Sequence, residues 1–262
     1  MKVVLFCGGM GTRLREHSDT IPKPLVSIGY QPMLWYLMKY YAFYGHRDFI
    51  ICLGYRGDLI KDYFLNYDGR YADDLLLARG RTVSSADADD VGNWNIQFVE
   101  TGLHQSIGMR LKAVQPYLRG ESVFLANYSD QLSDLPLRDY LDKFESTGAL
   151  AGFVAVRPPQ SYHVSTIEDD GTVTGMRSVR DDNCWINGGY LVLRQEIFDY
   201  LHEGEELVEE PFQRLIAARR LYSYKYTGFW RSMDTFKDKI AFDRMWSRQD
   251  EPWKVWAKPK EG

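Results

Sequence analysis

A glycine-rich turn near the N-terminus, residues 8–11, has the clearest chemical potential in the chain. It directly follows the apolar run of residues 3–7, which is typical of a short buried strand. Glycines let backbone N–H groups come close to a ligand, and phosphate oxygens need such donors. Arg13 and Lys23 add positive charge, and Lys23 is held between two prolines that disfavour a helix. The segment therefore predicts a polyphosphate-binding loop, with a plain strand-to-loop turn bearing surface charges as the alternative.

Two better-known phosphate loops do not match this turn. A P-loop requires a Gly-Lys-Ser/Thr sequence after four intervening residues, and the chain has no such sequence here. The dinucleotide fingerprint requires a third small residue at the position that Leu14 occupies. The turn therefore stays a candidate phosphate-binding loop that follows neither of these two designs.

Asp130 and Asp234 are the two acidic residues that stand out. Asp130 follows the buried-strand pattern of residues 122–126, where an ionised carboxylate needs a cation or a metal as its partner. Asp234 precedes the last predicted helix, residues 237–246. A helix cap is the alternative for each of them. Two carboxylates that converge near a polyphosphate predict a Mg²⁺ site, because Mg²⁺ prefers oxygen ligands.

Arg110 lies at the start of a predicted helix, residues 108–117. The N-terminus of a helix favours bound anions, so Arg110 is a further candidate for holding phosphate. A solvated helix arginine is the alternative. The histidines are scattered along the chain, and they form neither a triad nor a metal-ligand spacing.

The bulk properties exclude several classes of protein. A net charge of −4 argues against nonspecific nucleic-acid binding through a basic face. No apolar run approaches the length of about 18 residues that spans a membrane, and the N-terminal run is too short for a signal peptide. Cys7, Cys52 and Cys184 are widely spaced and are predicted to be free thiols in a reducing compartment. We therefore expect a cytoplasmic protein with no membrane and no nucleic-acid partner.

Strand and helix patterns alternate along most of the chain. Strands are predicted at residues 3–7, 49–53, 94–99, 122–126, 149–156, 188–193 and 221–226, and a hairpin at 164–179. Helices are predicted at residues 33–42, 59–64, 108–117, 137–146, 195–201, 211–218 and 237–246. This alternation is typical of an α/β protein with a mainly parallel sheet flanked by helices. Ligands of such sheets bind beyond the carboxyl ends of the strands, where the glycine-rich turn would lie.

Residues 67–93 interrupt this alternation. The segment is rich in acidic and small residues and has one apolar triplet, residues 75–77. A loop of this length without regular structure is uncommon in a compact domain. We predict a single domain over residues 1–262, with an insertion at 67–93 that packs on a neighbouring subunit or covers the site. A disordered excursion is the alternative.

With these residues in view, the chain resembles the glucose-1-phosphate cytidylyltransferases, which are sugar-phosphate nucleotidyltransferases. The resemblance runs almost end to end and is carried by residues 8–14 (GGMGTRL), 22–24 (PKP), 32–35 (PMLW), 48–55 (DFIICLGY), 60–64 (IKDYF), 108–111 (GMRL), 186–189 (INGG), 228–230 (GFW), 233–235 (MDT) and 252–256 (PWKVW). It implies the nucleotidyltransferase fold, a Rossmann-like, mainly parallel mixed sheet flanked by helices, with a long insertion and a small C-terminal sub-region.

The same resemblance implies an activity and an assembly. The reaction is Mg²⁺-dependent transfer of a cytidylyl group from CTP to glucose 1-phosphate, or to a related or altered phosphate or phosphonate acceptor, with release of pyrophosphate. The family forms homo-oligomers, hexamers in the best-known members. The choice of CTP over other nucleoside triphosphates rests on the resemblance alone.

Site residues carry over from the family position by position. The nucleotide would be bound by Phe6, Cys7, Gly8, Gly9, Met10, Gly11, Thr12, Arg13, Lys23, Gln105, Arg110 and Ser129, with Arg13 and Lys23 in the catalytic role. Asp130 and Asp234 would ligate Mg²⁺. The acceptor would contact Tyr128, Asn187 and Trp230, and Arg177 or Arg180 would replace the charge of a family lysine that this chain lacks.

The departures from the family gather on the acceptor side. Where the family usually reads Tyr-Gly-Asp-Gly, residues 128–131 read Tyr-Ser-Asp-Gln, so both glycines are replaced. The Arg-Phe-Gly-Ala stretch appears as Ser-Tyr-His-Val at 161–164, and the Glu-Lys-Pro motif falls at about 178–180, Ser-Val-Arg. Gln105 stands where the family has a small hydroxyl residue. A catalytically silent, nucleotide-binding regulatory subunit is therefore the alternative to an enzyme with an altered acceptor.

Overall fold

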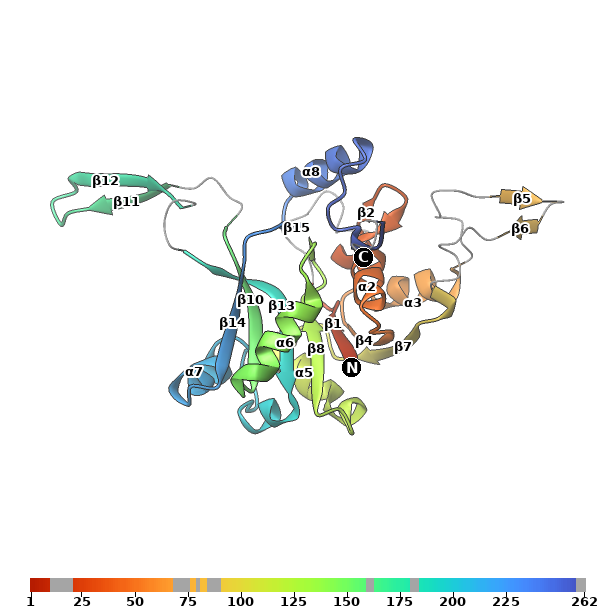
Figure 1. Cartoon of the computed structure of the whole chain (residues 1–262), viewed down its shortest axis with the longest axis horizontal. Helices are drawn as coiled ribbons and strands as arrows, with labels where there is room; N and C mark the ends of the chain where they lie inside the picture. The colour runs from red at the N-terminus through yellow and green to blue at the C-terminus, as the bar shows by residue number, and fades with distance from the viewer. Residues whose placement is uncertain are drawn as a thin grey trace.

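A seven-stranded sheet crosses the middle of the molecule (Figure 1). The computed structural model describes residues 1–9, 21–67, 76–78, 81–83, 91–158, 163–179 and 184–257. The strands lie in the order β14 (Leu221–Tyr226), β10 (Ala151–Val156), β13 (Ile186–Arg194), β8 (Val123–Asn127), β1 (Lys2–Phe6), β4 (Asp48–Leu53) and β7 (Asn95–Glu100). Within this sheet β13 runs antiparallel to both neighbours and the remaining pairs are parallel. The predicted mainly parallel mixed sheet is confirmed.

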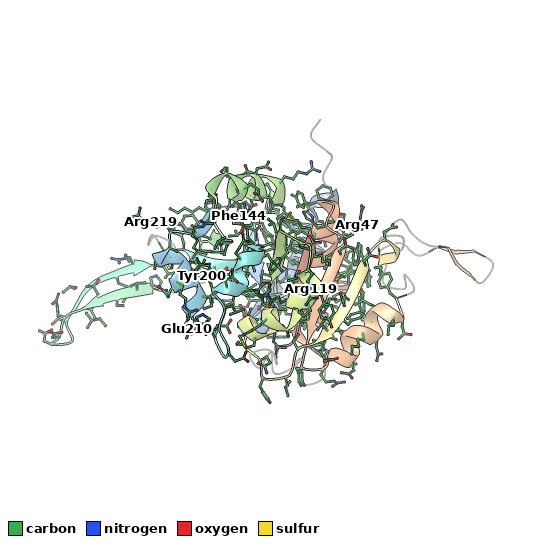
Figure 2. All side chains as sticks on the ribbon, turned by 90° about the horizontal axis from the view of Figure 1, so that it is seen from below. Arg47, Arg119, Phe144, Tyr200, Glu210 and Arg219 are labelled. Carbon is green, nitrogen blue, oxygen red and sulfur yellow. The ribbon has the colours of Figure 1, made fainter. Side chains whose placement is uncertain are left out.

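The central strands are buried because helices cover the sheet on both sides. Val3 and Leu5 of β1 point into one core, and Val4 and Phe6 point into another. The first core is closed by α2 (Met33–Phe43), α3 (Gly57–Leu65) and α6 (Leu137–Thr147), and the second by α5 (Ile107–Val114) and α7 (Glu210–Ala217). Figure 2 shows Phe144 of α6 and Glu210 of α7 on opposite sides of the sheet. Strands covered on both faces read as continuous apolar runs, as those of β1 and β4 do.

Helix α2 is buried almost all round, whereas the sequence predicted one apolar face. Every residue from Met33 to Ala42 is buried, including Lys39. The C-terminal segment explains the difference, because α8 (Phe236–Ser247) is followed by η5 (Val255–Ala257), whose Trp256 stacks on Tyr36. Lys39 lies with its ammonium 4.9 Å from the centre of the Trp35 ring. A helix with apolar residues on every side is stable only when neighbours cover it in this way.

Other elements differ from the predictions in detail. Residues 195–201 form the 3-10 helix η4 (Gln195–Asp199), not an α-helix. Helix α5 gives way to η3 (Gln115–Leu118), since Pro116 cannot continue the α-helical hydrogen bonds. Short strand pairs that the patterns did not predict are β2 (Ser27–Ile28) with β3 (Gln31–Pro32), and β9 (Gln131–Ser133) with β15 (Trp230–Ser232).

Two hairpins project from the body of the molecule (Figure 1). The predicted hairpin is confirmed as β11 (His163–Ile167) and β12 (Val173–Ser178), and Gly171 takes a left-handed φ of 88° in its turn. The predicted insertion contains β5 (Leu76–Ala78) paired with β6 (Arg81–Val83), and most of its other residues lie outside the described ranges. Among the described helices, none has the length and apolar character needed to cross a bilayer. The three cysteines are free thiols; Cys7 and Cys52 are buried, as the sequence predicted, whereas Cys184 is only half-buried.

Candidate active site

A cavity of about 720 Å³ opens at the carboxyl ends of β1 and β8. Its lining residues are Phe6, Cys7, Gly8, Gly9, Lys23, Pro24, Leu103, His104, Gln105, Ser106, Ile107, Arg110, Tyr128, Ser129, Asp130, Glu206, Val208 and Asp234. A volume of this size suits a ligand as large as a nucleotide. The place agrees with the rule that ligands of parallel sheets bind beyond the carboxyl ends of the strands.

Lys23, Asp130 and Asp234 meet in this cavity. The Lys23 ammonium donates to Asp130 Oδ2 and to Asp234 Oδ1, each across 2.7 Å. Burial acts to lower the pKa of Lys23, but the two carboxylates outweigh it and the pKa is raised. Burial raises the pKa of Asp130, and the Lys23 ammonium offsets only part of that rise. The cluster therefore concentrates charge of both signs beside the glycine-rich turn.

The pairing of β9 with β15 brings the two carboxylates together. Asp130 immediately precedes β9, Asp234 follows the end of β15, and the strands run antiparallel with Gln131 opposite Ser232. The backbone N–H of Met233 donates to the carbonyl of Asp130 across 2.8 Å. The start of one strand thus lies beside the end of the other, although the two residues are far apart in sequence.

Neither aspartate caps a helix. Thr235 caps α8, because its side chain accepts from the Asp238 N–H while Asp238 accepts from the Thr235 N–H. The helix that follows Asp130, α6, begins only at Leu137. The helix-cap alternatives from the sequence are therefore wrong, and both carboxylates point to the cavity instead.

Asp130 is aimed by a strained turn. Its neighbour Ser129 has a φ of 66°, in the left-handed region that favours glycine, and is fully buried. The backbone N–H of Ser129 donates to Asn127 Oδ1 across 2.8 Å, and the Gln131 side-chain amide donates to the same oxygen across 3.1 Å. Asn127 therefore fixes both neighbours of Asp130, Ser129 and Gln131, by hydrogen bonds to one oxygen. Strain of this kind persists only where the surroundings over-determine the backbone, as at functional sites.

Arg110 is buried and bonded to protein oxygens. Its guanidinium donates to the carbonyls of Gly8 (3.1 Å), Leu53 (3.3 Å) and Leu103 (3.1 Å), and to Thr101 Oγ1 (2.8 Å). The solvated-arginine alternative is therefore wrong. The same contacts explain a glycine, because a Cβ on Gly8 would collide with this guanidinium. Arg110 lines the cavity and also fixes the backbone of the turn.

The structure collects the described members of the predicted nucleotide set in one place. Phe6, Cys7, Gly8, Gly9, Lys23, Gln105, Arg110 and Ser129 all line the cavity. Met10, Gly11, Thr12 and Arg13 lie outside the described residues. Burial raises the pKa of the Cys7 thiol to about 12, so this sulfur stays protonated at neutral pH.

The predicted acceptor residues divide into two groups. Tyr128 lines the cavity, and its hydroxyl accepts from the Asn187 side-chain amide across 3.0 Å. Trp230 donates from Nε1 to the carbonyl of Gly188, which follows Asn187. Arg177 lies on β12, in the hairpin that projects from the body (Figure 1), and Arg180 lies outside the described residues.

Glu206 is a cavity residue that the sequence did not single out. Its carboxylate accepts from the backbone N–H groups of Ile107 (3.1 Å) and Leu207 (2.9 Å). It belongs to an acidic stretch, residues 203–210, that looks like a solvated surface in the sequence. Only the packing of this stretch against the start of α5 turns the side chain into the cavity.

The donor set suits a hard cation bound by few protein ligands. Among the described residues no group of three or more His, Cys, Asp or Glu side chains is close enough to cage a metal. Asp130 and Asp234 both reach one positive centre, the Lys23 ammonium. Mg²⁺ commonly takes one or two carboxylates and completes its shell with water and phosphate oxygens.

Comparison with known proteins defines the class of the molecule. The family model described as nucleotidyl transferase matches residues 2–242. Among solved structures, UDP-glucose pyrophosphorylase complexed with UDP-glucose superposes with a TM-score of 0.69 at 16% identity, covering 95% of this chain and 98% of that one. A putative glucose-1-phosphate thymidylyltransferase from Bacillus anthracis gives a TM-score of 0.67 at 15% identity, with 94% of each chain covered. At these identities the structural likeness concerns the fold.

Sequence relatives narrow the class further. The glucose-1-phosphate cytidylyltransferase of Salmonella typhi is 34% identical over 257 residues, which are 98% of this chain and all of the relative. The probable glucose-1-phosphate cytidylyltransferase of Bacillus subtilis is 35% identical over 258 residues, with the same coverage. The chain therefore belongs to the nucleotidyl transferase family, and within it to the group of the glucose-1-phosphate cytidylyltransferases.

Proposed function

We propose that the protein transfers a cytidylyl group from CTP to a phosphorylated acceptor and releases pyrophosphate. The acceptor is glucose 1-phosphate or a related phosphate or phosphonate. The observation that carries the proposal is the meeting of Lys23, Asp130 and Asp234 in the cavity at the glycine-rich turn. The names of relatives that are 34% and 35% identical over nearly the whole chain support the choice of cytidylyl and of glucose 1-phosphate.

The reaction needs no nucleophile from the protein. An oxygen of the acceptor phosphate attacks the α-phosphorus of CTP, a new P–O bond forms, and the bond to the β-phosphate breaks to release pyrophosphate. Lys23 neutralises charge on the phosphates, and the backbone N–H groups of residues 8 and 9 offer donors to their oxygens. The Cys7 thiol, protonated at neutral pH, is not the nucleophile. Positioning and charge neutralisation then supply the rate.

Asp130 and Asp234 would hold Mg²⁺ in this site. Two carboxylates that converge on one ammonium form a donor set of the right chemistry for this ion. When bound, Mg²⁺ supplies positive charge that lowers the repulsion between the triphosphate and the acceptor phosphate. Lys23, which donates to both carboxylates in this structure, would contribute further positive charge beside the phosphates.

A pyrophosphate-release assay tests the proposal. Each of the four common nucleoside triphosphates is paired with a panel of sugar phosphates, other phosphate esters and phosphonates, with and without Mg²⁺. We expect turnover with CTP, dependent on Mg²⁺ and on the acceptor. Nucleotide binding by calorimetry without turnover for any pair would instead support a catalytically silent regulatory subunit.

Assembly, location and partners stay predictions of the sequence. We infer a homo-oligomer, a hexamer by resemblance, located in the cytoplasm and binding neither nucleic acid nor membrane. Light scattering on the purified protein measures the mass of the assembly and decides the first point.

A further inference from the structure

Glu206 brings a negative charge into a cavity that must accept a triphosphate. It lies between η4 and α7, half-buried, with Oε2 3.1 Å from the N–H of Ile107 and Oε1 2.9 Å from the N–H of Leu207. A carboxylate accepts hydrogen bonds and donates none. Each carboxylate oxygen has two lone pairs and accepts one backbone N–H, so each oxygen can still accept a hydrogen bond from a ligand.

Phosphate groups are poor neighbours for this carboxylate. Like charges repel most strongly in a partly dehydrated cavity. Lys23 lies with Asp130 and Asp234 on segments that pack against α2 and β9. The other described cation of the cavity, Arg110, already donates to three backbone carbonyls and to Thr101 Oγ1. Glu206 comes from the opposite side of the sheet, where Leu207 belongs to the core beneath α5. The phosphates therefore fit at the Lys23 side and the nucleoside at the Glu206 side.

The surroundings of Glu206 suit a flat, partly apolar group. Leu103, Ile107 and Val208 line the same cavity, and the backbone N–H of Ile107 donates to Glu206. Apolar side chains with a small number of polar groups at defined places are typical of sites that bind a base and fix its orientation. The Glu206 carboxylate, a charged acceptor among these apolar side chains, would then set which base edge is accepted.

We propose that Glu206 accepts a hydrogen bond from the exocyclic amine of cytosine and so selects CTP over UTP. This inference rests on the proposed function and adds the basis of its nucleotide choice. Uracil carries a carbonyl oxygen where cytosine carries the amine. That oxygen would face the carboxylate with no proton between them, which leaves a charged acceptor unpaired in the cavity. Sites built to bond a donor reject analogues that lack it far more strongly than apolar pockets reject a missing methylene.

The substitution Glu206→Gln tests the role of the carboxylate with little change of shape. A glutamine amide can still accept from cytosine, and it can also turn to donate to uracil. We expect the ratio of kcat/KM for CTP to kcat/KM for UTP to fall at least about tenfold. Glu205→Gln is the matched control, because Glu205 lies next in the chain but pairs with Arg214 and does not line the cavity. Its ratio should stay at the wild-type value.

A purely structural role gives a different result. If Glu206 only caps the start of α5, the variant loses kcat/KM for CTP and UTP by the same factor, and the proposal is overturned. If the Glu206→Gln variant loses kcat/KM for CTP but not for dCTP, the carboxylate contacts the ribose 2′-hydroxyl, and the proposal is also overturned. Calorimetric Kd values for CTP and UTP, measured on both variants after thermal unfolding has verified their fold, give the same ratio without turnover. If wild-type protein turns over no CTP at all, the proposed function fails first, and the Kd ratio still decides the role of Glu206.

Discussion

The ammonium of Lys23 lies 2.7 Å from Oδ1 of Asp234, a residue 211 positions further along the chain. The contact completes a three-residue cluster in the cavity, because the same ammonium also donates to Asp130. The side chains of Lys23 and Asp234 are only 15% and 31% exposed, so this ion pair is better shielded from water than a pair at the surface. An N-terminal and a C-terminal segment of the chain therefore meet at the candidate active site.

Replacing Lys23 by methionine should lower kcat/KM at least about 100-fold, because the transition-state charge loses a preorganised cation. The Asp130 and Asp234 carboxylates would also lose the ammonium that they share. Initial rates of pyrophosphate release with CTP and the acceptor measure the effect. Lys61→Met is the control, since Lys61 pairs with Glu100 at the surface and should leave the rate unchanged. Equal rates for Lys23→Met and wild type would remove Lys23 from the mechanism.

Ser129→Gly should be more stable than Ser129→Ala by about 1 kcal/mol, because glycine tolerates the left-handed backbone of this turn and alanine does not. Both variants lose the Ser129 hydroxyl, which donates to the carbonyl of Asn127, so the comparison isolates the backbone strain. Urea unfolding of the two variants gives the difference in the free energy of unfolding. An alanine variant as stable as the glycine variant would show that the turn is not strained.

Gly8→Ala should destabilise the protein by roughly 1–3 kcal/mol, because the new methyl group displaces a buried guanidinium from its acceptors. Gly9→Ala is the matched control, since a Cβ at Gly9 meets no described heavy atom within 4 Å. The melting temperatures of the two variants, compared with wild type, measure the effect. Equal melting temperatures would contradict the account of Arg110 as the support of the turn.

His46 should make stability depend on pH below neutrality. Burial lowers the pKa of His46 from 6.5 to about 4. Between these two values the unfolded chain takes up a proton that the folded chain refuses, so stability present above pH 6.5 is lost as pH falls toward 4. Free energies of unfolding at pH 7 and pH 5 should differ more for wild type than for His46→Gln. An equal difference for both proteins would assign the pH dependence to other groups.

Much of the sheet could be predicted from the sequence because its strands are continuous apolar runs between turn residues. β1, β4 and β8 occur within a residue or two of their predicted positions. The sequence also singled out Lys23, Asp130 and Asp234. A charge next to a buried or constrained segment is costly unless it is paired with another charge or a ligand. The places of Lys23, Asp130 and Asp234 in one cluster agree with that reasoning.

The remaining features depend on contacts that no local pattern encodes. β9 and β15 are three residues long and have no periodicity to detect, yet their pairing aligns the two aspartates. Arg110 reads as a helix-start arginine, and only the packing of α5 under the turn commits it to the carbonyl of Gly8. Glu206 lies in an acidic run with exposed members, so the sequence alone does not distinguish it from a surface residue. Tertiary placement, not composition, makes these residues part of the site.

The central claim is best tested by ³¹P NMR of CTP, glucose 1-phosphate and Mg²⁺ incubated with wild-type protein and with Asp234→Asn. For wild type we predict that the triphosphate resonances give way to those of a diphosphate-linked product and of pyrophosphate. The Asp234→Asn variant should convert CTP at least about 100-fold more slowly. Unchanged triphosphate resonances with wild-type protein, across the panel of acceptors and with bound CTP verified by calorimetry, would contradict the account.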